Sequence, residues 1–265
     1  MRDPMACDPR YLEAAACFAD AARATAMKYF RQNPGITRKP DASLVTEADL
    51  AVETHLRGMI SAAFPTHDII GEEFEALGTS SALQWVVDPI DGTSRFAAAH
   101  PQFAVLISLL FEGSPILGLL DAPATDERWI GARGHPTMFF DKEGGHLARV
   151  RECASLGDAT VFLGGGMMRL QDPMAVWNAL PGKNRLMEGE AYGYGLLASG
   201  YADIVTDCGM KIWDYLPLVP IVEGAGGVIT DWSGRGLLRE QNVNIIATGS
   251  SELHRVSIAR LEGLV

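Results

Sequence analysis

The chain has 265 residues, of which 48% are hydrophobic, and its 22 basic and 33 acidic side chains give a formal net charge of −11 at pH 7. This length and composition allow a sizeable core, either in one compact unit or in two fused halves. With a sequence pI near 5.0, the chain lacks the basic surface that nucleic-acid binding requires, so no nucleic-acid partner is expected. A small anionic substrate would have to be attracted by bound metal and not by the electrostatic field of the negatively charged protein.

The cysteines and the N-terminal segment indicate the compartment. Cys7, Cys17, Cys153 and Cys208 show no C-x-x-C spacing, which disfavours a zinc site and a disulfide framework. Residues 1–32 are rich in alanine but interrupted by charges, which predicts an amphipathic helix and not a signal peptide. No run approaches the roughly 20 apolar residues of a membrane span. We therefore expect a cytoplasmic protein without a membrane partner.

In the first half of the chain, two helices precede a series of strands. Helices are expected over roughly 8–32 and 47–64, because an Asn-Pro-Gly sequence follows the first and Pro65 follows the second. Apolar or alternating runs, separated by Gly, Pro and Asp turns, then predict strands at 67–71, 84–88, 103–111, 116–121 and 127–132.

After a polar stretch near 141–158, the second half alternates between strands and helices. Strands are predicted at 161–163, 202–206, 227–230 and 244–248, and helices at 173–180, 192–199 and 213–225. A glycine-rich run at 164–166 predicts a tight strand-to-helix turn. The chain should therefore form a layered α/β architecture of two halves, 1–148 and 149–265, with the functional site between them.

The most informative segment is 85–96, which reads WVVDPIDGTSRF. An apolar, strand-like run leads directly into a turn that contains the carboxylates of Asp88 and Asp91 and the hydroxyl of Thr93. Because the run before the turn favours burial, the two carboxylates should converge at the mouth of a strand and not form a solvated charge run.

Such a turn can hold Mg²⁺. Hard cations bind carboxylates, backbone carbonyls and waters, and substrate phosphate oxygens complete the shell, so Asp88, Asp91 and the carbonyl of Ile90 are candidate ligands. Gly92 permits a backbone conformation that a residue with a Cβ would resist, and it allows the following amides to approach a phosphate. The alternative is an ordinary Asp-Pro turn with a helix-capping aspartate. The apolar strand before the turn favours the metal site.

Two further acidic clusters lie at the ends of predicted elements. Glu72 and Glu73 end the strand at 67–71, and Asp214 lies at the start of the helix predicted at 213–225. A two-metal site holds its ions roughly 3.5–4 Å apart and needs bridging carboxylates. Glu72, Asp88, Asp91 and Asp214 make a plausible set for it. The alternatives are a solvated surface pair for Glu72 and Glu73, and a helix N-cap for Asp214.

These motifs resemble those of the inositol monophosphatase superfamily, which comprises Mg²⁺-dependent, lithium-sensitive phosphomonoesterases. The resemblance covers nearly the whole chain, through LVTEAD at 44–49, IIGEE at 69–73, WVVDPIDGT at 85–93 and IWDYLPLVPIVEGAGGVITDWSG at 212–234. Within the superfamily, KPDASLVTEAD at 39–49, the SRF ending of the aspartate turn, APATDERWIGARG at 122–134 and VPIVEGAGGVITDW at 219–232 look most like the histidinol-phosphatase branch.

The resemblance implies an αβαβα sandwich of the inositol monophosphatase and fructose-1,6-bisphosphatase type, a homodimer, and two or three Mg²⁺ ions per site. Glu72, Asp88, the Ile90 carbonyl and Asp91 would bind the activating metal, with Asp88, Asp91 and Asp214 serving a second ion. Residues 1–148 would thus carry most metal ligands, and 149–265 the last ligand and the loops that determine substrate specificity.

The resemblance also implies catalytic and phosphate-binding roles. Thr93, with Glu72 beside it and Asp49 behind it, would orient and deprotonate the attacking water. The amides around Gly92, Thr93 and Ser94 would hold the phosphate. These roles suit phosphoryl transfer, which needs positioning and charge neutralisation more than covalent chemistry.

Asp207 and Glu190 are the candidates for reading the leaving group. Asp207 occupies the place where the family contacts that group. At Glu190, the histidinol-phosphatase branch commonly has an aspartate, so this chain keeps a carboxylate but moves it outward by one methylene. Glu190 would pair with a substrate ammonium, or it lies on an exposed edge and recognises nothing. Arg95 replaces the family's usual asparagine, which argues against a plain inositol phosphatase. Lys39 is a further candidate for facing the phosphate.

We therefore expect a phosphomonoesterase that acts on a small soluble phosphate, with histidinol phosphate of histidine biosynthesis first and inositol 1-phosphate second. A 3′(2′),5′-bisphosphate nucleotidase or a sugar bisphosphatase comes third. The alternative from a different class is a non-catalytic interaction protein on the same fold.

Overall fold

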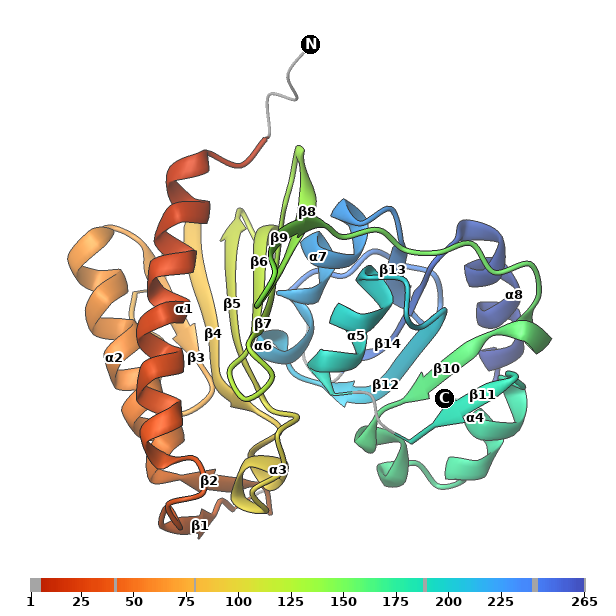
Figure 1. The fold of residues 1–265 in the computed structure, drawn as a ribbon, viewed down its shortest axis with the longest axis horizontal. Coiled ribbons are helices and arrows are strands. Elements are labelled where there is room, and N and C mark those ends of the chain that lie inside the picture. The colour runs from red at the N-terminus through yellow and green to blue at the C-terminus, as the bar shows by residue number, and fades with distance from the viewer. Residues whose placement is uncertain (1–5, 41, 79, 188–189, 240–242, 265) are drawn as a thin grey trace.

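The computed structural model of the chain describes residues 6–40, 42–78, 80–187, 190–239 and 243–264. These residues form five layers in which helices and sheets alternate. Figure 1 shows, from left to right, helices α1 and α2, a seven-stranded sheet, helices α5 to α7, a five-stranded sheet, and the outer helices α4 and α8. This αβαβα arrangement confirms the predicted layered fold.

The large sheet is built from residues before 148. Its strands, in their order across the sheet, are β3 (Asp68–Gly71), β4 (Leu83–Asp91), β5 (Ala104–Phe111), β6 (Ser114–Ala122), β7 (Glu127–Ala132), β8 (His135–Asp141) and β9 (Gly144–Leu147). Strands β3 and β4 pair in parallel, and each later strand pairs antiparallel with its neighbour. Strands β4 to β6 are apolar and buried along most of their length because helices cover both faces.

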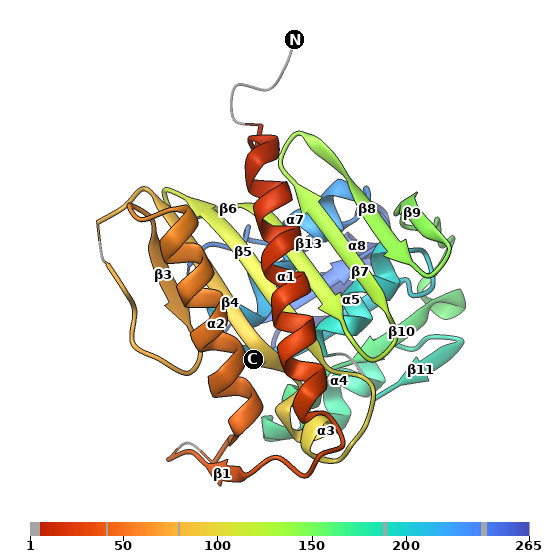
Figure 2. The same cartoon turned by 60° about the vertical axis from the view of Figure 1, so that its left-hand side comes forward.

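Two long helices cover the outer face of this sheet, as Figure 2 shows. They are α1 (Pro9–Tyr29) and α2 (Glu47–Ala63), joined through the hairpin of β1 (Ile36–Arg38) and β2 (Leu44–Thr46). Asp8 caps α1 by accepting the Arg10 N–H, and a capping box between Thr46 and Asp49 starts α2. The buried stripe of α1 packs on the sheet, where Phe18 meets Trp85 edge-on at 5.5 Å between ring centroids.

The small sheet comes from the second half of the chain. Its strands lie in the order β11 (Asn184–Leu186), β10 (Thr160–Leu163), β12 (Ile204–Met210), β14 (Val243–Thr248) and β13 (Val228–Asp231). Strand β10 pairs in parallel with β11 and β12, whereas β14 is antiparallel to both of its neighbours. Helices α4 (Pro173–Ala179) and α8 (Ser251–Leu261) bury Val176 and Leu253 against its outer face.

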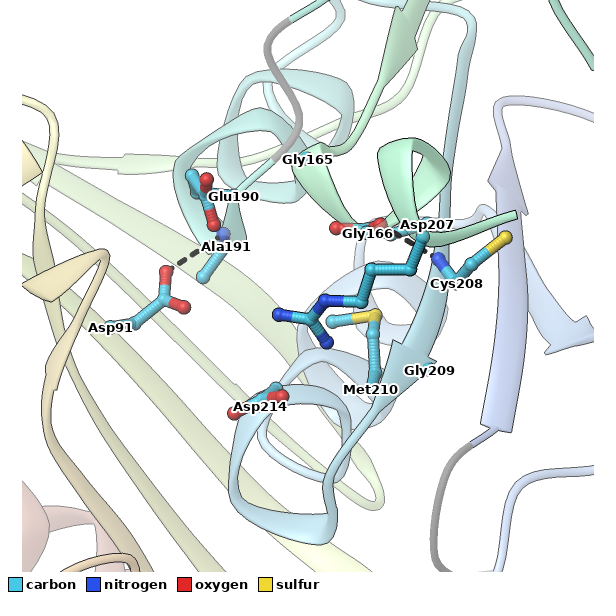
Figure 3. A pocket seen from close by; sticks show the side chains of 11 residues that line it. Asp91, Gly165, Gly166, Glu190, Ala191, Asp207, Cys208, Gly209, Met210 and Asp214 are labelled. Atoms are coloured by element: carbon cyan, nitrogen blue, oxygen red, sulfur yellow. Dashed lines mark hydrogen bonds between the residues drawn. The ribbon is translucent and has the colours of Figure 1, made fainter. Parts of the chain in front are cut away.

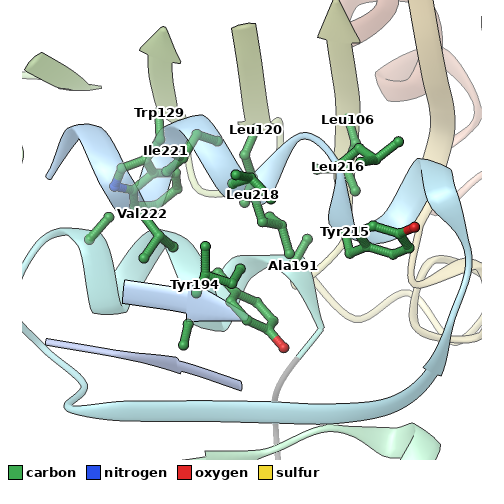
Figure 4. Close-up of a cluster of buried hydrophobic side chains, with 14 of the residues drawn as sticks. Leu106, Leu120, Trp129, Ala191, Tyr194, Tyr215, Leu216, Leu218, Ile221 and Val222 are labelled. Atoms are coloured by element: carbon green, nitrogen blue, oxygen red, sulfur yellow. The ribbon is translucent and has the colours of Figure 1, made fainter. Parts of the chain in front are cut away.

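The middle layer joins the two sheets. Helices α5 (Ala191–Ala198), α6 (Ile212–Tyr215) and α7 (Leu218–Gly224) form it. In Figure 4, Tyr194 of α5 and Ile221 of α7 lie in one cluster with Trp129 of the large sheet. A Cβ on Gly118 of β6 would lie only 1.8 Å from the Pro217 carbonyl oxygen. The helix backbone therefore rests directly on the strand, which fixes α6 and α7 relative to the large sheet.

Most predicted elements are present, with shifted ends. The first helix ends at Tyr29 and not near residue 32, because Arg31 and Asn33 have positive φ angles of 61° and 53°. Strand β4 runs three residues beyond the predicted end, through the aspartate turn to Asp91. The glycine-rich turn after β10 is confirmed: it leads into a short 3₁₀ helix, Gly165–Arg169.

The prediction of a single helix over 213–225 was wrong. Two helices, α6 and α7, replace it, and Pro217 between them has no N–H with which to continue the hydrogen-bond ladder. Strands β1, β2, β8, β9 and β11 and helices α3 and α8 have no counterpart among the predicted elements. Within the described residues, no helix combines the length and apolar character that a bilayer-spanning segment needs.

Candidate active site

The aspartate turn lies at the end of β4. The pairing of β4 with β5 shifts in register between Asp88 and Asp91, and this irregularity lets both carboxylates line one cavity. The Ile90 N–H donates to Asp88 Oδ1 at 2.9 Å. Gly92 has a φ of 81°, in the left-handed region that favours glycine, and helix α3 (Thr93–Ala97) starts directly after it. The turn thus places two carboxylates beside the first amides of a short helix.

Asp214 reaches this turn from the second half of the chain. It lies in the first turn of α6, where its Oδ2 accepts the Lys211 N–H at 2.8 Å. One oxygen from each of Asp88, Asp91 and Asp214 lies within 4.8 Å of the other two. The Ala191 N–H, at the start of α5, donates to Asp91 Oδ2 at 3.0 Å. Asp214 therefore caps its helix and joins the acidic cluster at the same time.

Glu72 follows β3 in a loop that a buried carboxylate of α2 holds. Glu53 is fully buried. Its Oε2 accepts the Glu73 N–H at 2.8 Å, and its Oε1 accepts the Phe74 N–H at 3.3 Å and the Arg57 Nε–H at 2.7 Å. This network fixes the backbone immediately after Glu72 and so sets where the Glu72 side chain enters the cavity.

The Glu72 and Glu73 side chains are not a solvated surface pair. Lys39 Nζ lies 3.0 Å from Glu72 Oε1 and 2.7 Å from Glu73 Oε1, and the Glu73 side chain is only 3% exposed. Burial raises the pKa of Glu73 to about 7 although Lys39 lies beside it. Lys39 also lines the cavity, where its ammonium pairs with these two carboxylates.

Thr93 connects the cavity with Asp49 behind it. The Thr93 Oγ1 lies 3.1 Å from Asp49 Oδ1 and 3.1 Å from the Ile90 carbonyl oxygen, so its single proton can be donated to either acceptor. The other Asp49 oxygen accepts the Thr46 N–H at 2.8 Å and the Thr46 hydroxyl at 2.5 Å. Burial raises the pKa of Asp49, and hydrogen bonds from Thr46 and Thr93 oppose the rise. The Thr93 hydroxyl therefore has a carboxylate at hand to take its proton.

A cavity of about 920 Å³ collects most of the predicted site residues. They are Glu72, Asp88, Ile90, Asp91, Gly92, Thr93, Ser94, Glu190 and Asp214. Asp49 does not line the cavity but reaches it through Thr93.

A second pocket of about 250 Å³ adjoins this cavity and is drawn in Figure 3. Asp91, Arg169, Glu190, Gly209 and Asp214 line both spaces. Asp207 lines only the second one, with its Oδ1 accepting the Cys208 N–H at 2.7 Å. Burial raises the pKa of Asp207 to about 7. The structure therefore places Asp207 beside the triad of Asp88, Asp91 and Asp214 and not within it.

The clustered carboxylates raise one another's pKa. Burial, followed by repulsion from neighbours such as Glu72, raises the pKa of Asp88 well above its ordinary value. Burial and the nearby Glu190 do the same for Asp91, and burial raises the pKa of Asp214 to about 7. A divalent cation would offset this repulsion, and carboxylates and backbone carbonyls are the ligands that Mg²⁺ takes. The residues present therefore fit a hard divalent cation.

Three residues that line or support the site were not among the predicted site residues. They are Glu53, Arg169 and Lys211. The spacing of Glu53 and Arg57 is that of an ordinary exposed helix pair, so the sequence carried no signal of a buried support. Arg169 and Lys211 line the cavity from the 3₁₀ helix after β10 and from the start of α6. Their position depends on the packing of the two halves, which no local motif encodes.

The layered fold and the acidic cavity together define a class of phosphatase. The model of the inositol monophosphatase family matches residues 9–264, and the chain belongs to this family. Its members are phosphoric monoester hydrolases that generally use Mg²⁺ and act on small phosphate esters.

Individual relatives differ in the substrates that they are named for. The chain is 37% identical over 264 residues to a bifunctional phosphatase, IMPL2, chloroplastic, of Arabidopsis thaliana, a match that covers 96% of this chain and 75% of the relative. It is 33% identical over 262 residues to a histidinol-phosphatase of Chlorobaculum parvum, covering 92% and 98% of the two chains. Among solved structures, an inositol monophosphatase from Zymomonas mobilis is similar with a TM-score of 0.84 at 32% identity, covering 96% of this chain and 98% of the other.

Proposed function

We propose that the chain is a Mg²⁺-dependent histidinol-phosphate phosphatase, which releases phosphate from the ester by attack of water. The observation that carries this proposal is a pair of carboxylates, those of Glu190 and Asp207, beside the 250 Å³ pocket next to the acidic cluster. Histidinol phosphate carries an ammonium group close to the scissile bond, and an acidic, partly buried wall favours such a cation. The names of the relatives from Chlorobaculum parvum and Mycobacterium tuberculosis support the same choice.

The acidic cluster would hold the metal. Glu72, Asp88, Asp91, Asp214 and the Ile90 carbonyl are the proposed ligands, for two or three ions per site. When bound, Mg²⁺ supplies positive charge that lowers the pKa of a water molecule and neutralises phosphate oxygens.

The remaining chemistry falls to Thr93, Asp49, Glu72 and the turn amides. The Thr93 Oγ1 would accept a hydrogen bond from the attacking water while donating its own proton to Asp49 Oδ1, 3.1 Å away. Glu72, which lines the same cavity, would orient the same water. The amides around Gly92, Thr93 and Ser94 would donate to the phosphate oxygens and hold the phosphorus in line with that water.

Inositol 1-phosphate is the second candidate substrate. It is favoured by the similarity to the Zymomonas mobilis inositol monophosphatase over 96% of this chain. An inositol leaving group presents hydroxyls and no cation, so it would make less use of two neighbouring carboxylates. A bisphosphate nucleotidase and a sugar bisphosphatase come third, because a second anionic group would lie against Glu190 or Asp207.

Phosphate release tests the proposal. We expect purified protein with Mg²⁺ to hydrolyse histidinol phosphate with a higher kcat/KM than inositol 1-phosphate, adenosine 3′,5′-bisphosphate or fructose 1,6-bisphosphate, and lithium to inhibit the reaction. A preference for inositol 1-phosphate would reject histidinol phosphate as the substrate but would leave the proposed metal site unchanged. Asp91→Ala should abolish turnover in a folded protein, whereas full activity of this variant would overturn the mechanism. A non-catalytic interaction protein would release phosphate from none of the substrates.

We further propose a homodimer, which the family resemblance implies, and a cytoplasmic location, which the cysteine pattern and the charge-interrupted N-terminal helix favour. Light scattering of the purified chain, whose monomer mass is 28.5 kDa, tests the assembly. A mass near twice this value is expected, and a monomer at working concentration would contradict it.

A further inference from the structure

A third pocket, of about 140 Å³, is lined by Glu190 but not by Asp207. Arg95 and Glu190 line both this pocket and the 920 Å³ cavity, so the two spaces adjoin at these side chains. Its other walls come from β10, β11, α5 and the chain between α3 and β5, which contributes Gln102. None of the roles assigned above uses this pocket.

The inner walls of the pocket are apolar. Phe162 of β10, Leu186 of β11 and Leu196 of α5 supply them, and Phe162 and Leu186 are neighbours across paired strands. Tyr192 also lines the pocket, but its hydroxyl donates to Glu127 at 2.6 Å. With that hydroxyl engaged elsewhere, Tyr192 contributes mainly its ring. These walls would favour a flat apolar group and would leave a polyol without hydrogen-bond partners.

The mouth of the pocket is polar and offers both acceptors and donors. The Glu190 carboxylate accepts from Arg95 Nε at 3.5 Å, and Arg95 Nη1 donates to Gln102 Oε1 at 3.0 Å. This chain of contacts holds the Glu190 carboxylate, an acceptor, next to the Arg95 guanidinium and the Gln102 amide, which are donors. The mouth therefore matches a ring that carries one N–H donor and one nitrogen acceptor.

We propose that this pocket binds the heteroaromatic ring of the leaving group as a neutral imidazole, with its N–H directed to Glu190 and its other nitrogen to Arg95 or Gln102. The inference rests on the proposed function. A side-chain imidazole has a pKa of about 6.5, so the neutral form predominates above about pH 7.5. An apolar wall with a matched donor and acceptor at its mouth selects that form over a hydrated cation.

The same assignment gives each group of the substrate its own space. The phosphate lies at the acidic cluster, the ammonium faces Asp207 in the 250 Å³ pocket, and the ring enters the 140 Å³ pocket. Glu190 lines all three spaces and thus stands where the branches of the leaving group diverge. Arg95 acts as a positioning residue that holds Glu190 at this point.

The test fills the pocket and compares three substrates that differ only in the side chain. They are histidinol phosphate, its phenyl analogue 2-amino-3-phenylpropyl phosphate, and ring-less 2-aminopropyl phosphate. Leu186→Trp on edge strand β11 fills the pocket, and Leu147→Trp on β9, the edge strand of the large sheet, is the matched control. Leu196→Phe is a second filling variant on a different element, for the case that Leu186→Trp fails to fold.

We expect the wild type to prefer the imidazole substrate, with the phenyl analogue intermediate because it fills the walls but has no N–H for Glu190. Filling the pocket should lower kcat/KM for histidinol phosphate by roughly tenfold or more, through KM, and leave 2-aminopropyl phosphate unchanged. Leu147→Trp should behave as the wild type with all three.

Two results would overturn the inference while leaving the proposed function intact. One is hydrolysis of histidinol phosphate that Leu186→Trp and Leu196→Phe do not impair. The other is an equal loss with the ring-bearing and ring-less substrates, which would reflect general damage to the site. Failure of the proposed function looks different: the wild type would release no phosphate from histidinol phosphate, and both ideas would then be rejected.

Discussion

Each aspartate of the acidic cluster accepts a hydrogen bond from a backbone N–H group that helps to position it. Asp88 accepts from Ile90 at 2.9 Å, Asp91 from Ala191 at 3.0 Å, and Asp214 from Lys211 at 2.8 Å. One such bond orients a carboxylate and leaves oxygen lone pairs for a cation. An arginine paired with each aspartate would instead have competed with the metal. These backbone hydrogen bonds therefore orient the aspartates in a way that supports cation binding.

The Thr93 hydroxyl allows a test that separates chemistry from binding. Thr93→Val keeps the shape of the side chain but removes the proton path to Asp49. We expect kcat to fall by roughly 100-fold to 10,000-fold, the usual range for general acid–base catalysis. Steady-state kinetics should show this fall with little change in KM or in the Mg²⁺ needed for half-maximal activity. Thr93→Ser keeps a hydroxyl and should retain most of the rate. If Thr93→Val had the kcat of the wild type, Thr93 would have no role in the mechanism.

Glu53 tests whether support from outside the cavity affects the metal. Glu53→Gln keeps an acceptor oxygen for the Glu73 N–H but loses the charge that pairs with Arg57. We expect the free energy of unfolding in urea to fall by about 1–3 kcal/mol, and calorimetry to show weaker Mg²⁺ binding. Glu252→Gln breaks an exposed pair with Arg255 and should change neither quantity. Mg²⁺ affinity equal to that of the wild type in Glu53→Gln would restrict Glu53 to a role in stability.

At the scale of elements, the sequence patterns predicted the bounds of helices and strands best where one face of the element is buried. Helix α2 and strand β7 match their predicted ranges within a residue, because a capping box and a clear apolar run delimit them. Asp88 and Asp91 were located because local turn chemistry marks them, and Asp214 because it lies at the start of a predicted helix. Strand β9 is exposed along its whole length, so it carries no burial pattern to read. The support by Glu53 and the pocket at Leu186 arise only when segments far apart in the chain pack together.

Among these long-range contacts, the one between β6 and the residue before α7 leaves the least space for a side chain. Gly118→Ala would place its Cβ about 1.8 Å from the Pro217 carbonyl oxygen, and a backbone atom cannot move aside locally. We expect a loss of at least roughly 2–3 kcal/mol in the free energy of unfolding, measured in urea. Gly58→Ala, at an exposed position of α2 where no atom outside the local helix backbone lies within 4 Å of the new Cβ, should instead stabilise the protein by about 0.5–1 kcal/mol. Equal stability of the two variants would mean that the helices of the middle layer can shift to accommodate the new Cβ.

For the whole molecule, buried acids make the stability of the metal-free protein depend on pH. Burial raises the pKa of Asp207 to about 7, against about 3.9 in an unfolded chain. Between these values the native state holds the proton and the unfolded state does not, so the stability from Asp207 is complete below about pH 4 and is lost as pH rises through 7. Asp207→Asn should therefore gain stability relative to the wild type, by on the order of 2–4 kcal/mol, from pH 4 to pH 8. Urea unfolding in the presence of EDTA measures the difference, and a constant difference across this range would contradict the raised pKa.

Metal binding should act on the stability of the entire fold, because the acidic cluster joins both halves of the chain: Asp88 and Asp91 belong to the large sheet and Asp214 to the middle layer. A net charge of −11 adds general repulsion that a cation relieves. At 100 times its dissociation constant, Mg²⁺ should raise the free energy of unfolding by about 2.7 kcal/mol and the Tm by several degrees.

Asp91→Asn separates the metal effect from screening by salt. Without metal, the variant should be more stable than the wild type, because it relieves repulsion among buried carboxylates, yet Mg²⁺ should no longer raise its Tm. Glu13→Gln on the exposed face of α1 removes the same charge away from the site and should keep the full response. Thermal melts at constant ionic strength, with and without Mg²⁺, measure both effects. A wild-type response in Asp91→Asn would mean that Mg²⁺ stabilises the fold through its surface charge, and the cluster would then have to be reassigned.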